Sequence, residues 1–519
     1  MFKDLFDKMK ESKKPSDKND KKQAEENGED KNSDNANKLT SQSIMGKLSK
    51  NADAIFRELF ICGNKNLTAT LVYIDGLVDS KTVGDDVIKP LMEENKLCHA
   101  KSTKEAISLI EHGFVHFPSQ KTRKTTEETL GDILNGGCAI VFDDENIALT
   151  FDTKGFMQRS ITEPTEENIV KGPKDVFVEN IRVNTATLRR KIKSPDLVVE
   201  QVTIGRRTMT PVALVYMDGI VNKKLVSDVK AKLESIDVDG ILESGFIEEY
   251  LTEHKGTTFP QVVATERPDV FSINLLEGHV GILIDGIPVS YIVPGLLYQY
   301  LRTPDDYSQN YIIVSLVRLM RYILMAVTLF LPAFYVAVTT FHHEMIPSRL
   351  ALSIAASKEG VPYPAFIEVL LLLVAFEILL ESGLRLPKNI GQAVSIVGAL
   401  VVGEAAVNAK FISPAVVVVV AATAISGFSA PNQAIADSLR MWRIIMVILS
   451  STLGLIGMMF GAITLLFNLA TLEPFGIPYL SPFAGNEGQD LDDSIIRIPL
   501  KMMKNRPQSL NTEDRRRQK

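Results

Sequence analysis

Four aspartates stand where apolar segments end, and they are the first candidates for chemistry. Asp75, Asp143, Asp218 and Asp285 each close a segment rich in β-branched residues. Carboxylates placed together at strand ends can act as general acid and base, or bind a metal ion. Aspartate after a strand is also ordinary turn chemistry, and we expect that role here. The sequence therefore predicts no catalytic residues and a protein that is not an enzyme.

No combination of residues predicts a bound metal or cofactor. Cys98, His99, His112 and His116 lie close together in the chain, but their spacing matches no zinc-binding pattern. The Lys-Gly-Pro sequence at 171–173 lacks the spacing and the Gly-Lys-Ser/Thr ending of a phosphate-binding loop. We therefore expect neither a metal ion nor a cofactor.

The cysteines indicate reduced thiols rather than a disulfide framework. Their number is odd and no CxxC motif is present. The first residues also lack the continuous apolar core of a signal peptide, which places the N-terminal part in the cytoplasm, where thiols stay reduced. The cysteines are Cys62, Cys98 and Cys138.

Glutamates in or beside apolar segments of the C-terminal half are stronger candidates for a function. A charged side chain in hydrocarbon is costly unless it faces protein or water. Glu368 and Glu381 stand at segment ends, where we expect them in headgroup water. Glu377 and Glu404 are the candidates for an ion path or a pair between subunits, and nothing in the sequence ranks one above the other.

Small residues cluster in the third apolar segment. At near-helical spacing they let helix backbones approach closely, and they also leave room for a narrow pore. The sequence leaves these two interpretations open. The candidate packing residues are Gly391, Ser395, Gly398 and Gly403, with Gly457 and Gly461 in the last segment. The candidate pore or gate residues are Ile396, Val397, Leu400, Val401 and Glu404.

Long apolar segments position these residues. The five segments are about 312–341, 364–382, 390–409, 411–428 and 442–472. About 20 apolar residues cross a bilayer core, and a helix satisfies its own backbone there. We therefore predict an all-α polytopic membrane domain, with Pro332 locally breaking the first helix.

Basic residues indicate which side of the membrane the ends occupy. Arg318 and Arg321 open the first segment, which favours a cytoplasmic N-terminal region. The basic C-terminal tail also favours the cytoplasm, whereas five spans would place it outside. One segment must then be re-entrant, interfacial or hidden in the count.

The region before these segments repeats itself. Residues 71–78 read LVYIDGLV and residues 214–221 read LVYMDGIV, and 133–143 matches 275–285 in the same way. The offset stays at 142 or 143 residues. Constant spacing over separate matches predicts two tandem, related α/β subdomains.

Composition sets the remaining limits. The chain has 519 residues, a formal net charge of −6 and 45% hydrophobic residues. Residues 1–50 are highly charged and poor in aliphatic side chains, which predicts a disordered tail. No basic face with interleaved aromatic residues indicates nucleic-acid binding. Within the linker, the basic residues at 189–191 could contact lipid or a neighbouring subunit. They fit a solvated helix face equally well.

The expected organisation follows from these patterns. It comprises a disordered tail (1–50), a first α/β subdomain (51–160), a helical linker (161–195), a second α/β subdomain (196–305), a membrane domain with about five apolar helices (306–483) and a basic cytoplasmic tail (484–519).

Several long motifs resemble one family. They are PDLVVEQVTIGRRTMTPVALVYMDGIVN (195–222), IPSRLALSIAASKEGVPYPAFI (346–367), FEILLESGLRLP (376–387), GQAVSIVGALVVGEAAV (391–407) and FGIPYLSPF (475–483). In this order they closely resemble the A subunits of spore germinant receptors, the GerA family. The resemblance extends from about residue 54 to residue 483 and omits the N-terminal tail.

The resemblance implies a place and partners. It implies a multi-pass protein of the inner spore membrane, in contact with membrane lipid, with its soluble domain facing the spore core. The partners would be a transporter-like B subunit that holds the germinant, a lipoprotein C subunit, and further copies of the chain in a ring of five. Such a complex would be a nutrient-gated channel for monovalent cations.

Other function classes fit less well. A subunit of a secondary transporter would show repeats within the membrane region, whereas here the repeat lies before it. A paralogue that contributes to ion release without a receptor complex is a further alternative within the family. The leading hypothesis is a non-enzymatic signalling subunit.

Overall fold

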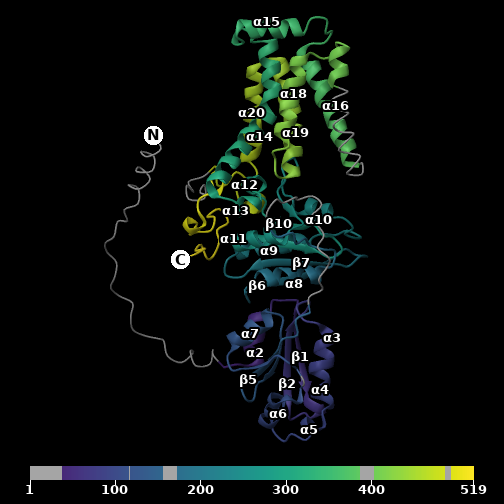
Figure 1. Ribbon diagram of the computed structural model, residues 1–519, viewed down its shortest axis with the longest axis vertical. Helices are drawn as coiled ribbons and strands as arrows, with labels where there is room; N and C mark the ends of the chain where they lie inside the picture. The colour runs from purple at the N-terminus through teal and green to yellow at the C-terminus, as the bar shows by residue number, and fades with distance from the viewer. Residues whose placement is uncertain (1–37, 116, 156–171, 386–402, 485–492, 519) are drawn as a thin grey trace, which may run out of the picture.

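The computed structural model describes residues 38–115, 117–155, 172–385, 403–484 and 493–518. It is elongated, with a first sheet at one end, a second sheet in the middle and a helical region at the other end (Figure 1). The two sheet regions correspond to the two copies of the sequence repeat.

The first sheet has five strands in the order β1-β2-β4-β5-β3, and every neighbouring pair is antiparallel. Its strands are β1 (Ala54–Phe60), β2 (Thr68–Ile74), β3 (Gln120–Arg123), β4 (Cys138–Phe142) and β5 (Ile147–Phe151). Helices cover both faces, so alternating strand residues enter two different apolar cores. The helices of this region are α2 (Ser41–Leu48), α3 (Ser80–Thr82), α4 (Lys89–Glu93), α5 (Asn95–Cys98), α6 (Thr103–Leu109) and α7 (Thr126–Leu134), with π-helical turns at Val83–Ile88 and Ile110–Phe114.

The second sheet repeats this architecture. Its order β6-β7-β9-β10-β8 is the same as that of the first sheet, strand for strand. Its strands are β6 (Leu197–Ile204), β7 (Thr210–Met217), β8 (Val263–Thr265), β9 (Val280–Ile284) and β10 (Ser290–Val293). Its helices are α8 (Ile181–Lys191), α9 (Lys223–Glu234), α10 (Ser244–Leu251) and α11 (Pro268–Glu277), followed by α12 (Leu297–Leu301) and α13 (Asp305–Ser308). One apolar core continues from this sheet into the helical region.

The expectation of a disordered tail over residues 1–50 is wrong for its last part. Residues 1–37 lie outside the described residues, but α2 is folded against the first sheet. Leu39, Ile44 and Leu48 have no exposed surface. These three apolar residues supply the core contact that the charged composition of the segment conceals.

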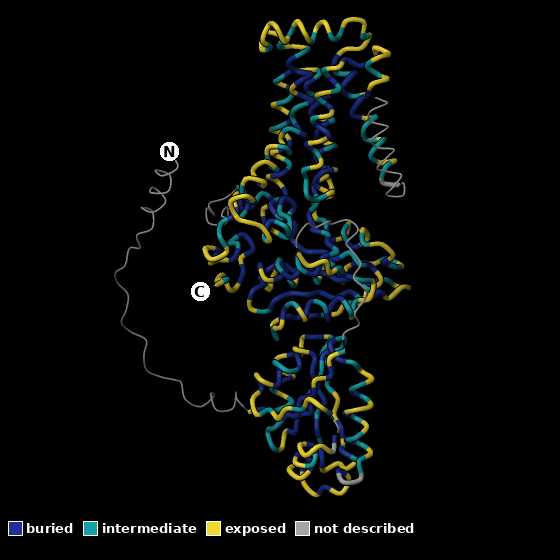
Figure 2. The backbone as a smooth tube through the Cα atoms, viewed as in Figure 1, coloured by how far each residue is buried: buried dark blue, intermediate teal, exposed yellow. Residues whose placement is uncertain are grey.

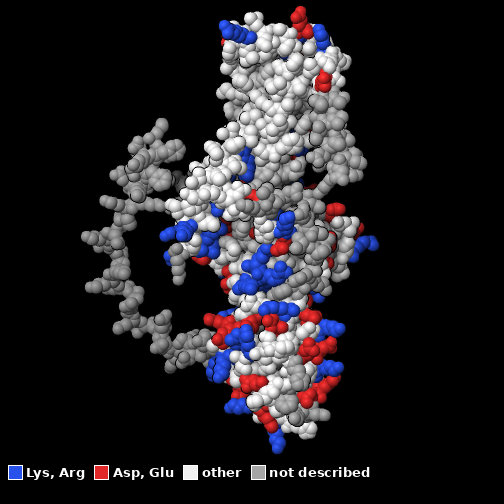
Figure 3. Space-filling view, viewed as in Figure 1, with Lys and Arg blue, Asp and Glu red and all other residues white. Residues whose placement is uncertain are grey.

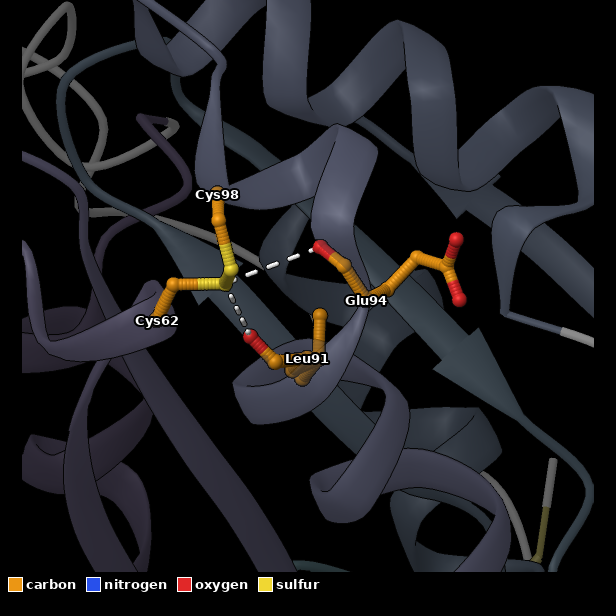
Figure 4. The surroundings of a disulfide bond; sticks show 4 residues. All are labelled: Cys62, Leu91, Glu94 and Cys98. Carbon is orange, nitrogen blue, oxygen red and sulfur yellow. Dashed lines mark hydrogen bonds between the residues drawn. A yellow bond between two sulfur atoms is a disulfide. The ribbon is translucent and has the colours of Figure 1, made fainter.

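The prediction of three reduced thiols is also wrong. Cys62 and Cys98 form a disulfide, and Cys138 is a free, buried cysteine. The two sulfurs are joined because the turn after β1 and the end of α5 meet in space, although 36 residues separate them in sequence. The Cys62 sulfur also lies 3.6 Å from the carbonyl oxygen of Leu91 and 3.8 Å from that of Glu94 (Figure 4). Burial raises the pKa of the Cys138 thiol to about 12, so it stays protonated.

The linker is helical only over α8. Residues 156–171 of the expected linker lie outside the described residues, and residues 172–180 are not helical. Asn180 caps the start of this helix, and its side chain accepts hydrogen bonds from the backbone of Arg182 and Val183. Its basic end contains a buried residue, because Arg189 is 0% exposed and binds Asp53 beside the first sheet. The expectation of lipid or solvent contact is therefore wrong for Arg189.

In the helical region, the last of the five expected segments is not a single helix. The described helices are α14 (Tyr311–Thr340), α15 (Ser348–Ser357), α16 (Ala365–Arg385), α18 (Pro414–Gly427), α19 (Gln433–Leu453) and α20 (Leu455–Ala470). Segment 442–472 is divided at Gly454, where φ is +63°, a conformation that glycine adopts without strain. In α14, by contrast, Pro332 does not break the helix, and the Ser450 hydroxyl donates a hydrogen bond to the adjacent Ala333 carbonyl.

The division at Gly454 accounts for the side on which the tail lies. At the start of α19, the Ser438 hydroxyl donates a hydrogen bond to the Thr258 carbonyl of the second sheet region. The chain reverses beside His342, at the far end of α14. α20 then returns, and Asn468 accepts a hydrogen bond from Thr257. The uncounted helix therefore brings the C-terminal tail back to the side of the sheets.

Among the described helices, α14 is long and apolar enough to cross a membrane, while α18 and α20 are apolar but shorter. Charged side chains concentrate over the sheets, and the visible face of the helical region carries few of them (Figure 3). The outer faces of its helices are exposed in the single chain (Figure 2). Large apolar side chains on these faces include Ile312, Leu316, Met320, Ile323, Ile448, Ile456, Phe460, Ile463 and Phe467. A surface of this kind requires lipid or protein to cover it.

Replacement of Gly457 by alanine is expected to destabilise the hairpin of α19 and α20. A Cβ atom there would lie 2.0 Å from the Leu449 carbonyl oxygen, so the two helices would have to separate. We expect a loss of about 1–3 kcal/mol, the usual cost of overpacking, measured by thermal unfolding of the purified full chain. Gly131→Ala is the control, because nothing lies within 4 Å of a Cβ at that helical position. Equal melting temperatures for both variants would refute the close approach.

Candidate functional site

An ion pair lies among the apolar helices and involves one predicted residue. Glu377 of α16 accepts a hydrogen bond from Arg443 of α19 at 2.5 Å, and Arg440 lies 3.8 Å from the same carboxylate. Arg443 is 2% exposed. A small cavity lies beside the pair, lined in part by Thr328 and Phe428. The pair neutralises a charge that would be costly in hydrocarbon.

The other three glutamates lie in different surroundings. Glu368 was expected in headgroup water, but it is 0% exposed and accepts a hydrogen bond from the Ser413 backbone at 2.7 Å. Its position near the start of α16 is covered because the chain returns over it at α18. Glu404 is exposed in the single chain, as is Glu381. Glu377 is therefore the only one of the two interior candidates with an ionic partner among the described residues.

Most predicted gate and packing residues of the third segment fall outside the described residues. They are Gly391, Ser395, Ile396, Val397, Gly398, Leu400 and Val401. Gly403 is described and buried, and a Cβ there would lie 3.9 Å from Val417. Gly461 of the last segment lies against Met446 of α19. A Cβ atom added at Gly461 would lie 2.5 Å from the Met446 sulfur, so this glycine, like Gly457, lies where the two helices contact each other.

The strand-end aspartates do not come together. Asp75 pairs with Arg182 at 3.1 Å, and Asp218 pairs with Lys50 at 2.7 Å. Asp143 and Asp285 accept backbone hydrogen bonds from Ser41 and Ile181. No group of three metal-ligating side chains occurs in the part of the chain that the structure describes. Asp143 and Asp285 therefore bind the starts of α2 and α8, and Asp75 and Asp218 form ion pairs with residues distant in the sequence.

A cluster of buried charges joins the second sheet region, α14 and the C-terminal tail. Arg318, in α14, is 1% exposed. Its guanidinium donates to Asp306 at 2.8 Å and to the Asp493 carboxylate at 2.9 Å. We call the following set the junction cluster: Glu277, Arg302, Asp306, Arg318, Arg321, Asp493 and Arg497. Figure 1 places this point between α11 and the lower end of α14.

The C-terminal tail is part of this arrangement. Arg497 donates to the backbone carbonyls of Asp306 and Gln309. Farther along, Arg506 donates to the Leu276 carbonyl at 2.8 Å, and Leu510 is completely buried. The described part of the tail is therefore folded onto the second sheet region.

Burial and ion pairing shift the pKa values of the acids in the junction cluster in opposite directions. Burial raises the pKa of Asp306, but Arg318 and Arg321 outweigh it and hold that pKa below its ordinary value. Burial dominates at Glu277 and raises its pKa, although Arg302 and Arg517 favour the charged form. Asp306 is thus the fixed negative charge of the cluster, and Glu277 is the acid that is costlier to ionise.

A buried histidine beside the cluster gives a pH dependence. Burial, with Arg302 nearby, lowers the pKa of His279 to about 3. The unfolded chain takes up this proton near pH 6.5 and the folded chain does not, so stability falls as pH drops below 6.5. We expect a loss of about 1.4 kcal/mol per pH unit from this residue between about pH 6 and pH 4, measured by thermal unfolding of the full chain.

The His279→Gln variant isolates this contribution. Glutamine can still accept the hydrogen bond that the Gln299 amide donates to the imidazole Nε2 at 3.0 Å. It has no titrating group, so its stability should depend less on pH than that of the wild type. Parallel pH profiles for the two proteins would show that His279 titrates normally.

Sequence reasoning found Glu377 and missed the junction cluster. Arg318 and Arg321 were interpreted only as indicators of the cytoplasmic side, and that interpretation gave them no partner. Asp493 is 175 residues away from Arg318, beyond all the helices. The one available signal was two arginines at the start of an apolar helix, which require acids if they are buried.

Comparison with known proteins gives consistent matches. The model of the family described as Bacillus/Clostridium GerA spore germination protein matches residues 42–509. The chain is 40% identical to spore germination protein KA of Bacillus subtilis (strain 168), over 91% of this chain and 86% of that protein. It is 34% identical to spore germination protein A1 of the same organism, over 90% of this chain and 94% of that protein.

One solved structure is also similar. The crystal structure of the N-terminal domain of the A subunit of the Bacillus megaterium spore germinant receptor GerK3 shares 33% sequence identity with this chain. It matches with a TM-score of 0.40, over 50% of this chain and 96% of that chain.

Proposed function

The chain belongs to the GerA family of spore germination proteins, the A subunits of spore germinant receptors, and from this membership we propose that it forms a nutrient-gated path for monovalent cations. In this proposal the chain is a non-enzymatic signalling subunit. Binding of a nutrient to a partner subunit shifts the complex from a closed to an open state. A ligand can do so only by binding the two states with different affinities.

The observation that carries this proposal is the ion pair of Glu377 and Arg443. It lies between two helices of the apolar region, beside a small cavity. Intramembrane ionisable residues mark ion pathways and the switches that control them. In the closed state the carboxylate is occupied by arginine. Opening would separate the pair and leave the carboxylate to attract a cation.

The junction cluster supports the signalling part of the proposal. It fixes α14 and the C-terminal tail to the second sheet region through Arg318, Asp306 and Asp493. A buried, multiply paired guanidinium resists partial separation, since breaking one pair leaves an uncompensated charge. A movement of the second sheet region would therefore move α14 with it.

The surroundings of the subunit complete the proposal. We place it in the inner spore membrane as a multi-pass protein, with the sheets on the cytoplasmic side. Its partners are a B subunit, a lipoprotein C subunit and further copies of itself in a ring of five. The exposed apolar faces of α14 and α20 are surfaces that lipid or neighbouring copies would cover.

The test is nutrient-triggered cation release from spores that carry Glu377→Gln. We expect release to slow at least tenfold while the amount of chain in the membrane stays the same. The matched control is Glu381→Gln, one turn away on the same helix and exposed. Exchanging the charges (Glu377→Arg with Arg443→Glu) should restore part of the rate. Normal release from Glu377→Gln spores would contradict a role for this pair in the cation path.

A further inference from the structure

One side of the second sheet region carries a group of exposed large apolar side chains. Phe246 and Tyr250 lie one turn apart on the same face of α10, and both are exposed. Leu242, just before this helix, is 74% exposed, and Met209, in the turn between β6 and β7, is 67% exposed. A hydrogen bond joins that turn to the loop before α10, so the four side chains belong to one surface. Together with the exposed acids Glu243 and Glu249, we call them the α10 patch.

The unpaired charges of the α10 patch are acidic. Glu243 and Glu249 form no ion pair with any described residue. The neighbouring charges already have partners: Arg206 pairs with Asp237, Arg207 pairs with Asp239, Lys232 pairs with Glu253, and Glu248 accepts a hydrogen bond from Tyr291. Lys255 lies beyond the end of α10, where the chain contacts α20 through Thr257. The patch is therefore apolar with an acidic border.

The C-terminal tail carries a second exposed apolar surface, with the opposite charge. Leu500 and Met502 are both exposed. The end of the chain lies beside them, because the Gln518 amide donates to the backbone carbonyls of Leu500 and Met503. The acids of this part of the tail are already paired, Glu513 with Lys223 and Asp514 with Arg506. We call Leu500 and Met502 the tail patch, together with four exposed bases that have no ion pair among the described residues: Lys501, Lys504, Arg515 and Arg516.

The two patches lie on opposite sides of the second sheet region, at a similar level along the molecule (Figure 1). Contact between two different patches of identical chains is heterologous, and a rotation that closes turns it into a ring. An axis parallel to the long axis of the molecule keeps every helical region at the same level, as a single membrane requires. Contact of either patch with itself would bring like charges together, which is unfavourable.

We propose that the α10 patch of one copy binds the tail patch of a second copy of this chain. The apolar side chains meet at the centre of the contact, and Glu243 and Glu249 pair with bases of the tail. The α10 patch belongs to the sheet region rather than to the apolar helices, so protein rather than lipid is the surface that covers it. This inference rests on the assembly of copies in the proposed function, and it names the surfaces that hold the copies together.

The test is site-specific photo-cross-linking of the full chain in spore membranes. A benzophenone amino acid replaces Met502, which is exposed in the tail patch. We expect an adduct with the mass of two chains, whose cross-linked peptide, identified by mass spectrometry, contains residues 242–250. Glu249→Lys in the same chain should lower the adduct yield at least fivefold, because it reverses a charge that faces the tail bases.

Charge reversal on both surfaces separates pairing from general damage. Lys501→Glu with Lys504→Glu, added to the Glu249→Lys chain, should restore part of the yield. The matched control is Glu127→Lys, the same change at an exposed glutamate of the first sheet region, and it should leave the yield unchanged. The amount of chain in the membrane is compared for all variants. A yield that Glu249→Lys does not change would overturn the proposal.

A second cross-linking experiment distinguishes failure of this contact from failure of the proposed assembly. An amine-reactive cross-linker, applied to the same membranes, reports association of copies through any surface. Multiples of the chain without an adduct between position 502 and α10 would overturn the contact and leave the assembly standing. A single chain by both methods would overturn both. An adduct only with lipid, with another protein or within one chain would also overturn the contact. Cation release is not measured, so the proposed cation path is tested separately.

Discussion

Replacement of Arg318 by alanine is expected to detach the C-terminal tail and the start of α14 from the second sheet region. Arg318 is 1% exposed and donates to both Asp306 and Asp493. Removal of one partner from a buried ionic group leaves uncompensated charges and costs about 3–5 kcal/mol. We expect less chain in the membrane, a lower melting temperature and rapid proteolysis of the tail, all measured on the full-length protein.

A double-mutant cycle makes this prediction specific. Asp493→Ala removes one of the two acids that lose a partner in Arg318→Ala, so the double variant should lose less stability than the sum of the two single variants. Arg515→Ala, at an exposed arginine of the same tail, is the matched control and should melt like the wild type. Additive losses would mean that the two residues do not act through one another.

Replacement of Arg189 by alanine is expected to have an effect of similar size at the boundary of the two sheet regions. The Arg189 guanidinium has no exposed surface and donates to both carboxylate oxygens of Asp53, at 2.5 and 2.7 Å. It also donates to Asn51 at 3.0 Å. The loss leaves the Asp53 carboxylate without its partner, again at a cost of about 3–5 kcal/mol.

The two regions should then unfold separately. In calorimetry of the purified full chain, we expect the first sheet region to melt in a separate transition at lower temperature. Arg190→Ala tests the adjacent, exposed arginine of the same helix and should change the melting profile little. An unchanged profile for Arg189→Ala would mean that other contacts hold the boundary.

The duplicated architecture could be predicted from the sequence because the repeat can be recognised in short, continuous segments. The LVYIDGLV and LVYMDGIV segments begin with the ends of β2 and β7, each the second strand of its sheet. The constant offset between the two copies then predicts that both copies have their strands and helices in the same order. Helix existence was equally accessible, since apolar runs of this length have few alternatives.

The remaining features depend on contacts between distant parts of the chain. Arg189 looks like one member of a solvated basic cluster until Asp53, 136 residues earlier, is placed beside it. The disulfide of Cys62 and Cys98 depends in the same way on a turn meeting a helix. The reversal at Gly454 carries a local signal, a lone glycine, but apolar composition continues across it and indicates a single helix.

The most direct test of the proposed cation path is conductance of the reconstituted receptor complex in a lipid bilayer. The complex with the wild-type chain should conduct monovalent cations only when the nutrient is present. The complex with Val397→Ala, a substitution at one of the candidate pore or gate residues, should conduct without nutrient. A complex that is properly assembled but shows no conductance with any nutrient would contradict the account. Nutrient-gated conductance that is identical for the two chains would place the gate elsewhere.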